Sequence, residues 1–301
     1  MDGKRSSFRI TRMLVPRGRW SVRYSAAVVC MVIGLLLWPG NVESSKAGTG
    51  AGTAIRFAAP PGMFFVGEEL VYQVSYSVFS LGTVKIQVLD TSTKAGVCTY
   101  RAKAFIDSYS GVPFVNLHYV FYSEIDQELY SHFFSGLDTK DPNKTAFSDY
   151  TFDYENNRVR YEKGIRQSDT KRTKGGDSIS TTYQDGLSLF YYARGHIHEM
   201  TKANVPTFVD EKKVNTFINF MNKKGSTEID AVKYPIETIE FDGRAEFVGV
   251  FGMTGGFSGW FSNDEAAIPV VARMKVILGS VYIELIQWNR PGWVPPRAAE
   301  D

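Results

Sequence analysis

The chain has 301 residues, of which 44% are hydrophobic and 14% aromatic, and its formal net charge is +2. This composition can supply a packed core and excludes an intrinsically disordered protein. Residues 1–25 contain seven Lys or Arg and one acidic residue, so that segment carries +6 and the rest of the chain about −4 (2 − 6). A mildly acidic body lacks the concentrated basic face that binds phosphates, and we expect no nucleic-acid partner.

The N-terminal segment is typical of an export signal. Its basic stretch is followed by Ala26–Trp38, thirteen residues without a charge, and then by small and polar residues. This order predicts a secretory signal, because thirteen residues are short for a hydrocarbon core of ~30 Å. We predict that residues 1–47 engage the membrane during export, either as a signal cleaved near Ala47 or as an uncleaved anchor. Both alternatives place the rest of the chain outside the cytoplasm.

The remaining chain divides by composition into three parts. Residues 48–62 are rich in Gly, Ala, Thr and Pro and are predicted to form a flexible leader. Residues 63–290 contain no convincing linker and are predicted to form a single β-rich domain. Residues 291–301 are predicted to be a disordered tail. Cys98 is the one cysteine beyond the signal, so we expect no internal disulfide and a small core side chain in a strand.

Alternation of apolar and polar residues with a period of two predicts strands over most of the domain. In the first strand Leu70 and Tyr72 fall on one side, and a turn at Ser80–Gly82 is expected to lead into the next strand. Ser168–Asp177 contains no apolar residue, which favours a solvated loop. Further strands are expected within Cys98–Ile106, Pro113–Phe134, Tyr150–Tyr161, Phe208–Phe220 and Thr227–Phe247.

Residues 270–288, VVARMKVILGSVYIELIQW, can be laid out as a hairpin. A two-residue turn at Gly279–Ser280 would place apolar residues opposite one another on one face. An alternative keeps Gly279 as a bulge within one long strand. The hairpin interpretation predicts the pairs Leu278–Val281, Val276–Ile283, Met274–Leu285, Ala272–Gln287, Lys275–Glu284 and Arg273–Ile286.

One helix is predicted, from Asp185 to Arg194. Asp185 can cap the free N–H groups at its start, and Gly195 is expected to stop it. A helix of about ten residues is not stable alone, so it must pack on a sheet. The predicted fold is therefore mainly β, an antiparallel β-sandwich or partly closed β-barrel with one short helix packed on the sheet.

Three stretches of this sequence form a recognisable set: Phe65–Leu70 with Tyr72, Val74, Tyr76 and Gly82; Asp185–Arg194; and Ile268–Val270 with Lys275, Gly279–Val281 and Glu284–Leu285. Within them Gly67, Glu68, Tyr72, Gly279 and Glu284 are interpreted as structural motif residues. Together these stretches resemble an exported bacterial family catalogued as domain of unknown function 3108. The similarity spans about residues 64–288, and Gly186 and Ala266–Ala267 depart from the family pattern. The resemblance implies a β-rich domain in a Gram-negative envelope and therefore a location in the periplasm, or on the periplasmic side of the inner membrane if the N-terminal segment is uncleaved. It implies no activity.

Several residues could carry chemistry, but each pattern is incomplete. His196 and His198 with Glu199 could ligate a metal, although no further ligand is clustered with them. Asn263–Glu265 resembles an acidic turn that could bind calcium, but turns select Asn and Asp for their own backbone hydrogen bonding, which favours a plain polar turn. Ser188 lacks the second glycine of a nucleophile elbow. We predict no catalytic residue, no metal and no cofactor.

The polar residues of the helix, Asp185, Tyr191, Tyr192 and Arg194, are the stronger candidates. In the structural interpretation Arg194 pairs with a strand carboxylate such as Glu68 or Glu284. In the functional one Arg194 and the tyrosine hydroxyls meet the polar head of an amphiphile. The leading hypothesis is a non-enzymatic envelope protein that binds a lipid or other amphiphile. The alternatives are a scaffold that docks an envelope protein through a strand edge, and a hydrolase.

Overall fold

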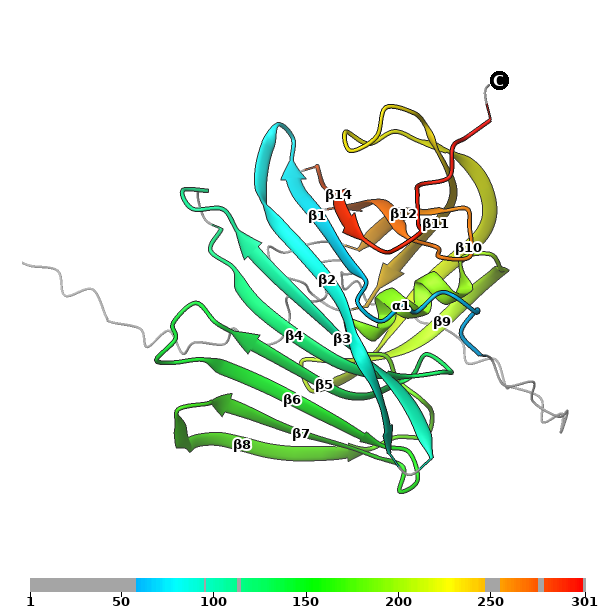
Figure 1. The fold of residues 1–301 in the computed structure, drawn as a ribbon. Coiled ribbons are helices and arrows are strands. Elements are labelled where there is room, and N and C mark those ends of the chain that lie inside the picture. Colours follow the sequence, from blue (N-terminus) through cyan, green and yellow to red (C-terminus); the bar gives the residue numbers. More distant parts are fainter. Residues whose placement is uncertain (1–57, 95, 113–114, 247–254, 276–278, 300–301) are drawn as a thin grey trace, which may run out of the picture.

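The computed structural model describes residues 58–94, 96–112, 115–246, 255–275 and 279–299, and the predicted signal segment lies outside them. These residues form fourteen strands and one helix (Figure 1). The helix is α1 (Ser188–His196). The strands are β1 (Glu69–Tyr76), β2 (Phe79–Lys94), β3 (Val97–Ser108), β4 (His118–Asp126), β5 (Ser131–Asp138), β6 (Ala146–Asp153), β7 (Arg158–Ile165), β8 (Ser168–Ser178), β9 (Met200–Val209), β10 (Lys212–Thr227), β11 (Ile236–Ala245), β12 (Gly256–Ser262), β13 (Pro269–Lys275) and β14 (Ser280–Asn289).

All fourteen strands belong to one antiparallel sheet. Strands that follow one another in the chain pair with each other, apart from β8 and β9, and β1 also pairs with β14. The order is β8-β7-β6-β5-β4-β3-β2-β1-β14-β13-β12-β11-β10-β9, so β8 and β9 are the edges. The sheet curves around α1 without closing (Figure 1). The predicted fold class, antiparallel β with one short helix on the sheet, is confirmed.

The segment before α1 connects two parts of the curved sheet that are distant in strand order. The N–H of Ser131 in β5 donates to Tyr183 O at 3.2 Å, and Gln184 forms a parallel bridge with Thr207 in β9. Phe208 of β9 packs edge-on against Tyr150 of β6, with ring centroids 5.0 Å apart. The β9 end of the sheet therefore lies against the inner face of β5 and β6, and the enclosed space forms the core.

Residues 168–178 form the edge strand β8, not the solvated loop that their polarity predicted. β8 pairs with β7 through backbone hydrogen bonds, and all eleven of its residues are polar or glycine and mostly exposed. An edge strand with both faces toward water needs no apolar residues, and charged side chains protect such an edge from further pairing. The prediction was wrong because side-chain periodicity reports burial, which this strand lacks.

The final hairpin forms with a different register from the predicted one. Met274 pairs with Val281 and Ala272 with Ile283, and Lys275 is opposite Ser280, so the connection is four residues long and not two. The predicted pairs of Val276 and Leu278 lie outside the described residues. Because the register differs by an even number of residues, the apolar side chains still share one face.

The first turn also differs from its predicted place. The chain turns at Ser77–Val78 and β2 begins at Phe79, so Gly82 lies inside the sheet opposite Val74. A Cβ at Gly82 would approach the carbonyl oxygen of Asp107 to 2.2 Å. Glycine is required there for close backbone approach and not for a turn.

The C-terminal tail is ordered against the sheet over its described part, which contradicts the predicted disorder of 291–301. Arg297 forms a bridge with Ile236 at the start of β11, and the indole N–H of Trp293 donates to Asp264 at 2.8 Å. These bonds and the aromatic contact of Trp293 with Trp288 hold the tail against the sheet, although its composition is polar and proline-rich. Cys98, expected in the core, is half-buried near the start of β3.

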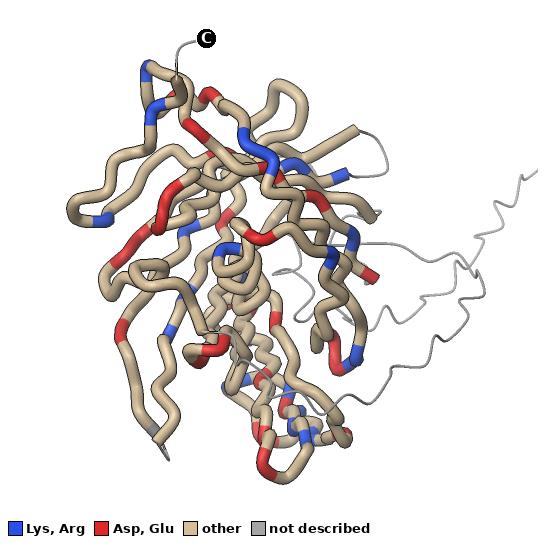
Figure 2. The backbone as a smooth tube through the Cα atoms, turned by 90° about the vertical axis from the view of Figure 1, so that its right-hand side faces the viewer, with Lys and Arg blue, Asp and Glu red and all other residues tan. Residues whose placement is uncertain are grey.

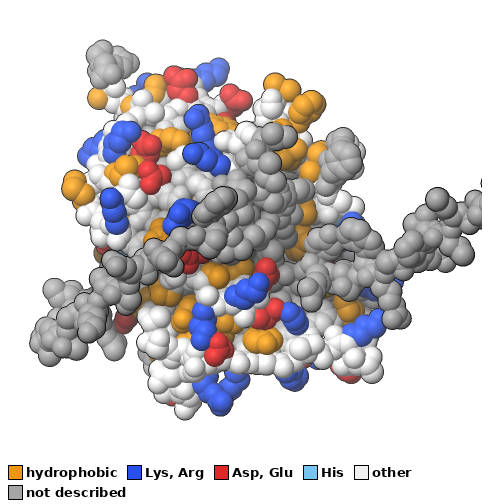
Figure 3. Space-filling view, turned by 180° about the vertical axis from the view of Figure 1, so that it is seen from behind, with side chains coloured by type: hydrophobic (Ala, Val, Ile, Leu, Met, Phe, Trp, Pro, Cys, Tyr) orange, Lys and Arg blue, Asp and Glu red, His pale blue; other side chains and the backbone are white. Residues whose placement is uncertain are grey.

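The surface of the described residues mixes both charge signs. Figure 2 shows Lys and Arg positions interspersed with Asp and Glu along the chain. In Figure 3 apolar side chains appear among charged ones on the rear face. Val78 is the most exposed large apolar residue described, at 86%. Within the described chain no helix is long and apolar enough to span a membrane.

Candidate functional site

The N-terminal end of α1 is fixed by the carboxylate of Asp185, which is fully buried. One carboxylate oxygen accepts from the N–H groups of Leu187 (2.7 Å) and Ser188 (2.9 Å). The other accepts from the hydroxyls of Ser123 in β4 and Ser131 in β5, both at 2.6 Å. The predicted capping role of Asp185 is confirmed, and the same side chain joins the helix to two strands.

The C-terminal end of α1 is fixed by Arg194, which is also fully buried. Its guanidinium donates to both carboxylate oxygens of Glu68, at 2.6 and 3.2 Å. It also donates to the backbone oxygens of Met63 (3.1 Å) and Ala266 (2.8 Å). The predicted pairing of Arg194 with Glu68 is confirmed. α1 ends at His196, one residue past Gly195, which was expected to stop it.

Glu68 is placed by the backbone just before β1. Gly67 has φ +88, a conformation that favours glycine, and its N–H donates to Val88 O at 2.8 Å. This leads Glu68 inward, where it is 1% exposed. A second guanidinium, that of Arg290 after β14, also donates to the Glu68 carboxylate. One carboxylate is therefore shared between two arginines in a largely buried site.

Three buried polar atoms beside this ion cluster have no hydrogen-bond partner: the hydroxyls of Tyr72 and Tyr191, and Nε of Arg194. The Arg194 guanidinium lies 5.6 Å from the ring centre of Tyr191. Burial raises the pKa of the Tyr72 hydroxyl, an effect opposed by Arg194 and reinforced by Glu68. Burial likewise raises the pKa of Tyr191. Both hydroxyls therefore stay protonated at neutral pH.

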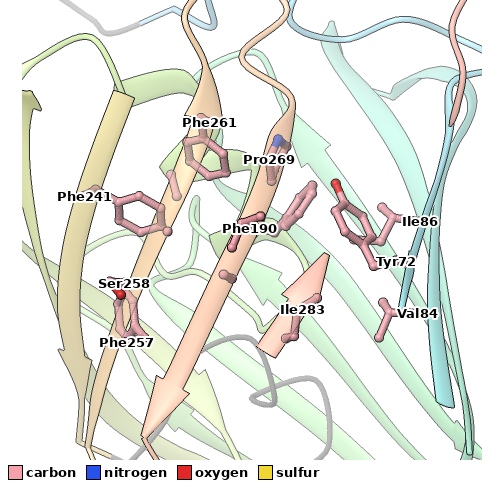
Figure 4. Close-up of a pocket in the computed structure, with 14 residues that line it drawn as sticks. Tyr72, Val84, Ile86, Phe190, Phe241, Phe257, Ser258, Phe261, Pro269 and Ile283 are labelled. Atoms are coloured by element: carbon pink, nitrogen blue, oxygen red, sulfur yellow. The ribbon is translucent and has the colours of Figure 1, made fainter. Parts of the chain in front are cut away.

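An apolar cavity of about 40 Å³ lies between α1 and the strands β1, β2 and β11–β14. Its wall includes Tyr72 and Ala193, the residue before Arg194, so the cavity adjoins the ion cluster. The rest of the wall is carbon apart from Ser258. Figure 4 shows Tyr72, Val84 and Ile86 on one side and Phe241, Phe257 and Phe261 on the other, with Phe190 between them.

The structure brings only two of the four predicted helix residues together. Tyr191 and Arg194 adjoin the Glu68 cluster, whereas Asp185 lies at the other end of α1, nine residues or about 13 Å away. Tyr192 is half-buried on another side of the helix, with its ring centre 4.2 Å from that of His196. Burial raises the pKa of Tyr192 to about 12.

Two residues of the site, Tyr72 and Arg290, are not predicted from the sequence to belong to it. Tyr72 was assigned only to a structural motif, although its position beside Leu70 on the apolar face of β1 indicated a buried hydroxyl. Arg290 follows the last strand, and nothing in its local sequence indicates a partner more than two hundred residues away.

The other candidate residues make local contacts. His196 Nδ1 lies 2.8 Å from Glu199 Oε1, while His198 Nε2 contacts the backbone oxygen of Asp264 at 3.1 Å. The described residues contain no group of three metal-ligating side chains. Ser188 donates to and accepts from the backbone of Asp185. Glu284 accepts from the N–H of Asp230 at 2.9 Å, and Gly279 has φ +89.

The fold and site together define a β-protein built from one curved antiparallel sheet, with a short helix held inside it by buried polar anchors. The chain belongs to the family described as "Protein of unknown function (DUF3108)", which matches residues 71–286. No curated protein matches the sequence.

Solved structures that match this chain share little sequence with it. A β-barrel-like protein of domain of unknown function DUF1849 from Brucella abortus is 11% identical, with a TM-score of 0.48 over 74% of this chain and 97% of the other. A protein with a YmcC-like fold from Bacteroides fragilis is 8% identical, with a TM-score of 0.36 over 78% of this chain and 100% of the other.

Proposed function

We propose that this protein is a non-enzymatic envelope protein that binds one end of an apolar or amphipathic molecule in the cavity beside α1. The observation that supports this most strongly is the carbon-lined wall contributed by the helix and six strands. Export to the periplasm, or to the periplasmic side of the inner membrane, is supported by the basic and apolar pattern of residues 1–47.

The size and lining of the cavity define what could enter it. A volume of about 40 Å³ exceeds the ~10–15 Å³ that one water needs, but a wall of carbon offers water few partners. The same volume is smaller than a whole lipid chain. We therefore expect the end of a chain to occupy the cavity while the remainder extends beyond it.

The alternative function, docking of an envelope protein on a strand edge, receives less support. The edge strand β8 carries Lys171, Arg172 and Lys174, and charges of this kind oppose addition of a further strand. The other edge strand, β9, is met at Thr207 by the bridge from Gln184.

The proposal can be tested with octan-1-ol and two matched substitutions in the full chain. Ala272→Ile adds carbon to the cavity wall, whereas Ala203→Ile makes the same change in β9, at a position that does not line the cavity. We expect octan-1-ol to raise the melting temperature of the unsubstituted protein and of Ala203→Ile. Ala272→Ile should fold and respond weakly. Equal responses from both variants, or no response from the unsubstituted protein, would refute the proposal.

A further inference from the structure

The ion cluster at the end of α1 lies beside three buried hydrogen-bond donors that have no partner. Arg194 Nε and the hydroxyls of Tyr72 and Tyr191 are buried, and none has a partner. Leaving a buried donor without an acceptor is unfavourable, and native proteins rarely do so. The Arg194 guanidinium lies 5.6 Å from the ring centre of Tyr191, and Tyr72 lines the same cavity as Ala193, the residue before Arg194.

The same cluster carries excess positive charge. Arg194 and Arg290 contribute +2, and Glu68 contributes −1, so the three side chains sum to +1. Asp185, the buried carboxyl group at the other end of α1, already accepts four hydrogen bonds there. An acceptor with negative charge would satisfy the unpaired donors and balance the cluster.

We infer that Tyr72, Tyr191 and Arg194 form a head-group site for a carboxylate, and that the attached acyl chain enters the cavity whose wall includes Tyr72. This inference rests on the proposed function, because the cavity must hold the part of the acyl chain that lies next to the carboxylate. It narrows the ligand class from any apolar or amphipathic molecule to an acyl carboxylate. The interaction is non-covalent: the hydroxyls and the guanidinium donate, and the carboxylate oxygens accept.

The test compares octanoate, octan-1-ol and acetate as ligands of the full chain at pH 7, by isothermal titration calorimetry. Octanoate and octan-1-ol share the chain and differ in the head group, whereas acetate has the head group without the chain. We expect octanoate to bind about tenfold more tightly than octan-1-ol, since hydrogen bonds to a charged group are the stronger ones. Acetate should bind far more weakly than both.

Two substitutions separate the head-group site from the cavity. Tyr72→Phe keeps the ring on the cavity wall and removes the hydroxyl, so octanoate affinity should fall about tenfold while octan-1-ol affinity stays unchanged. Tyr154→Phe removes the hydroxyl of a half-buried tyrosine that is already bonded to Ser131 O at 2.6 Å, and it should leave both affinities unchanged. Tyr191→Phe provides an independent repeat of the Tyr72→Phe experiment.

The outcomes distinguish the inference from the function on which it rests. Equal binding of octanoate and octan-1-ol, insensitive to Tyr72→Phe, would overturn the head-group site and leave the cavity function standing. Failure of both compounds to bind the unsubstituted protein would overturn the two together.

Discussion

The two ends of α1 are anchored in chemically opposite ways. At the N-terminal end Asp185 accepts four hydrogen bonds, from two backbone N–H groups and the hydroxyls of Ser123 and Ser131. At the C-terminal end two arginines share the single carboxylate of Glu68, and neighbouring donors stay unpaired. The first end is complete as it stands, whereas the second has unused hydrogen-bonding capacity.

This difference separates a structural role from a binding role within one short helix. A fully satisfied buried carboxyl group serves folding, because a further ligand would have to displace bonds already formed. A surplus of buried donors beside a cavity costs stability and is explained if a ligand supplies the acceptor.

The largest loss of stability is expected from Glu68→Gln. It leaves the guanidinium groups of Arg194 and Arg290 without their shared anion, so we predict a decrease of about 3–5 kcal/mol in the free energy of unfolding. Urea titration at pH 7 measures it. Glu69→Gln is the matched control, because the neighbouring carboxylate contacts Lys85 and Gln87 near the surface and should contribute about 1 kcal/mol or less. Similar effects of the two changes would contradict the buried ion cluster.

Removal of the N-terminal anchor should have the next largest effect. Asp185→Ala leaves two N–H groups at the start of α1 and the hydroxyls of Ser123 and Ser131 without their acceptor, and should cost about 2–3 kcal/mol. Ser123→Ala removes one of these donors and should cost about 1 kcal/mol. The same urea titration tests both, and the ranking fails if Ser123→Ala is the more damaging change.

The pH dependence of stability should also distinguish the N-terminal anchor. Burial raises the pKa of Asp185 above 3.8, although the bonds from Ser123 and Ser131 oppose the shift. A raised pKa in the folded state means that this group favours folding below about pH 3.8 and loses that contribution as the pH rises through its folded value. As the pH rises from about 3.5 to 7, the unsubstituted protein should therefore lose stability relative to the Asp185→Asn variant. Unfolding curves showing the opposite slope would reject this account.

The smallest expected changes are those of the tyrosine hydroxyls, and their signs differ. Tyr72→Phe and Tyr191→Phe each remove a buried hydroxyl without a partner, so each should raise the unfolding free energy of the ligand-free protein by about 1 kcal/mol. Tyr154→Phe removes a bond to Ser131 O and should lower it by about 1 kcal/mol. Thermal unfolding of the three variants checks these signs. A loss of stability in all three would show that the hydroxyls of Tyr72 and Tyr191 are satisfied.

Much of the fold could be predicted from the sequence because most strands have one buried face. The alternation around Leu70 and Tyr72 predicted β1, and Val84 and Ile86 point inward from β2 as expected. β8 was missed because it has no buried face to produce an alternation. The length of the last hairpin connection was wrong by two residues because an even shift preserves the apolar face and leaves no trace in the pattern.

Only one contact of the site could be predicted from the sequence, the pairing of its arginine with a carboxylate. A buried arginine on a helix must meet a carboxylate, and this led to the pair of Arg194 with Glu68. The unpaired donors could not be predicted, because they come from Tyr72 in β1 and from two residues of α1. The excess positive charge beside them also includes Arg290 beyond β14. Such a combination depends on how residues that are distant in the sequence are placed in three dimensions, and no local sequence pattern indicates it.

The most direct test of the proposed ligand binding is native mass spectrometry of the full chain, purified from the cells that produce it without detergent exchange. If the cavity beside α1 binds a chain end, part of the protein should carry one added acyl-containing molecule, and that adduct should be reduced in Ala272→Ile but retained in Ala203→Ile. A bare polypeptide mass, unchanged after incubation with octan-1-ol or octanoate, would contradict it.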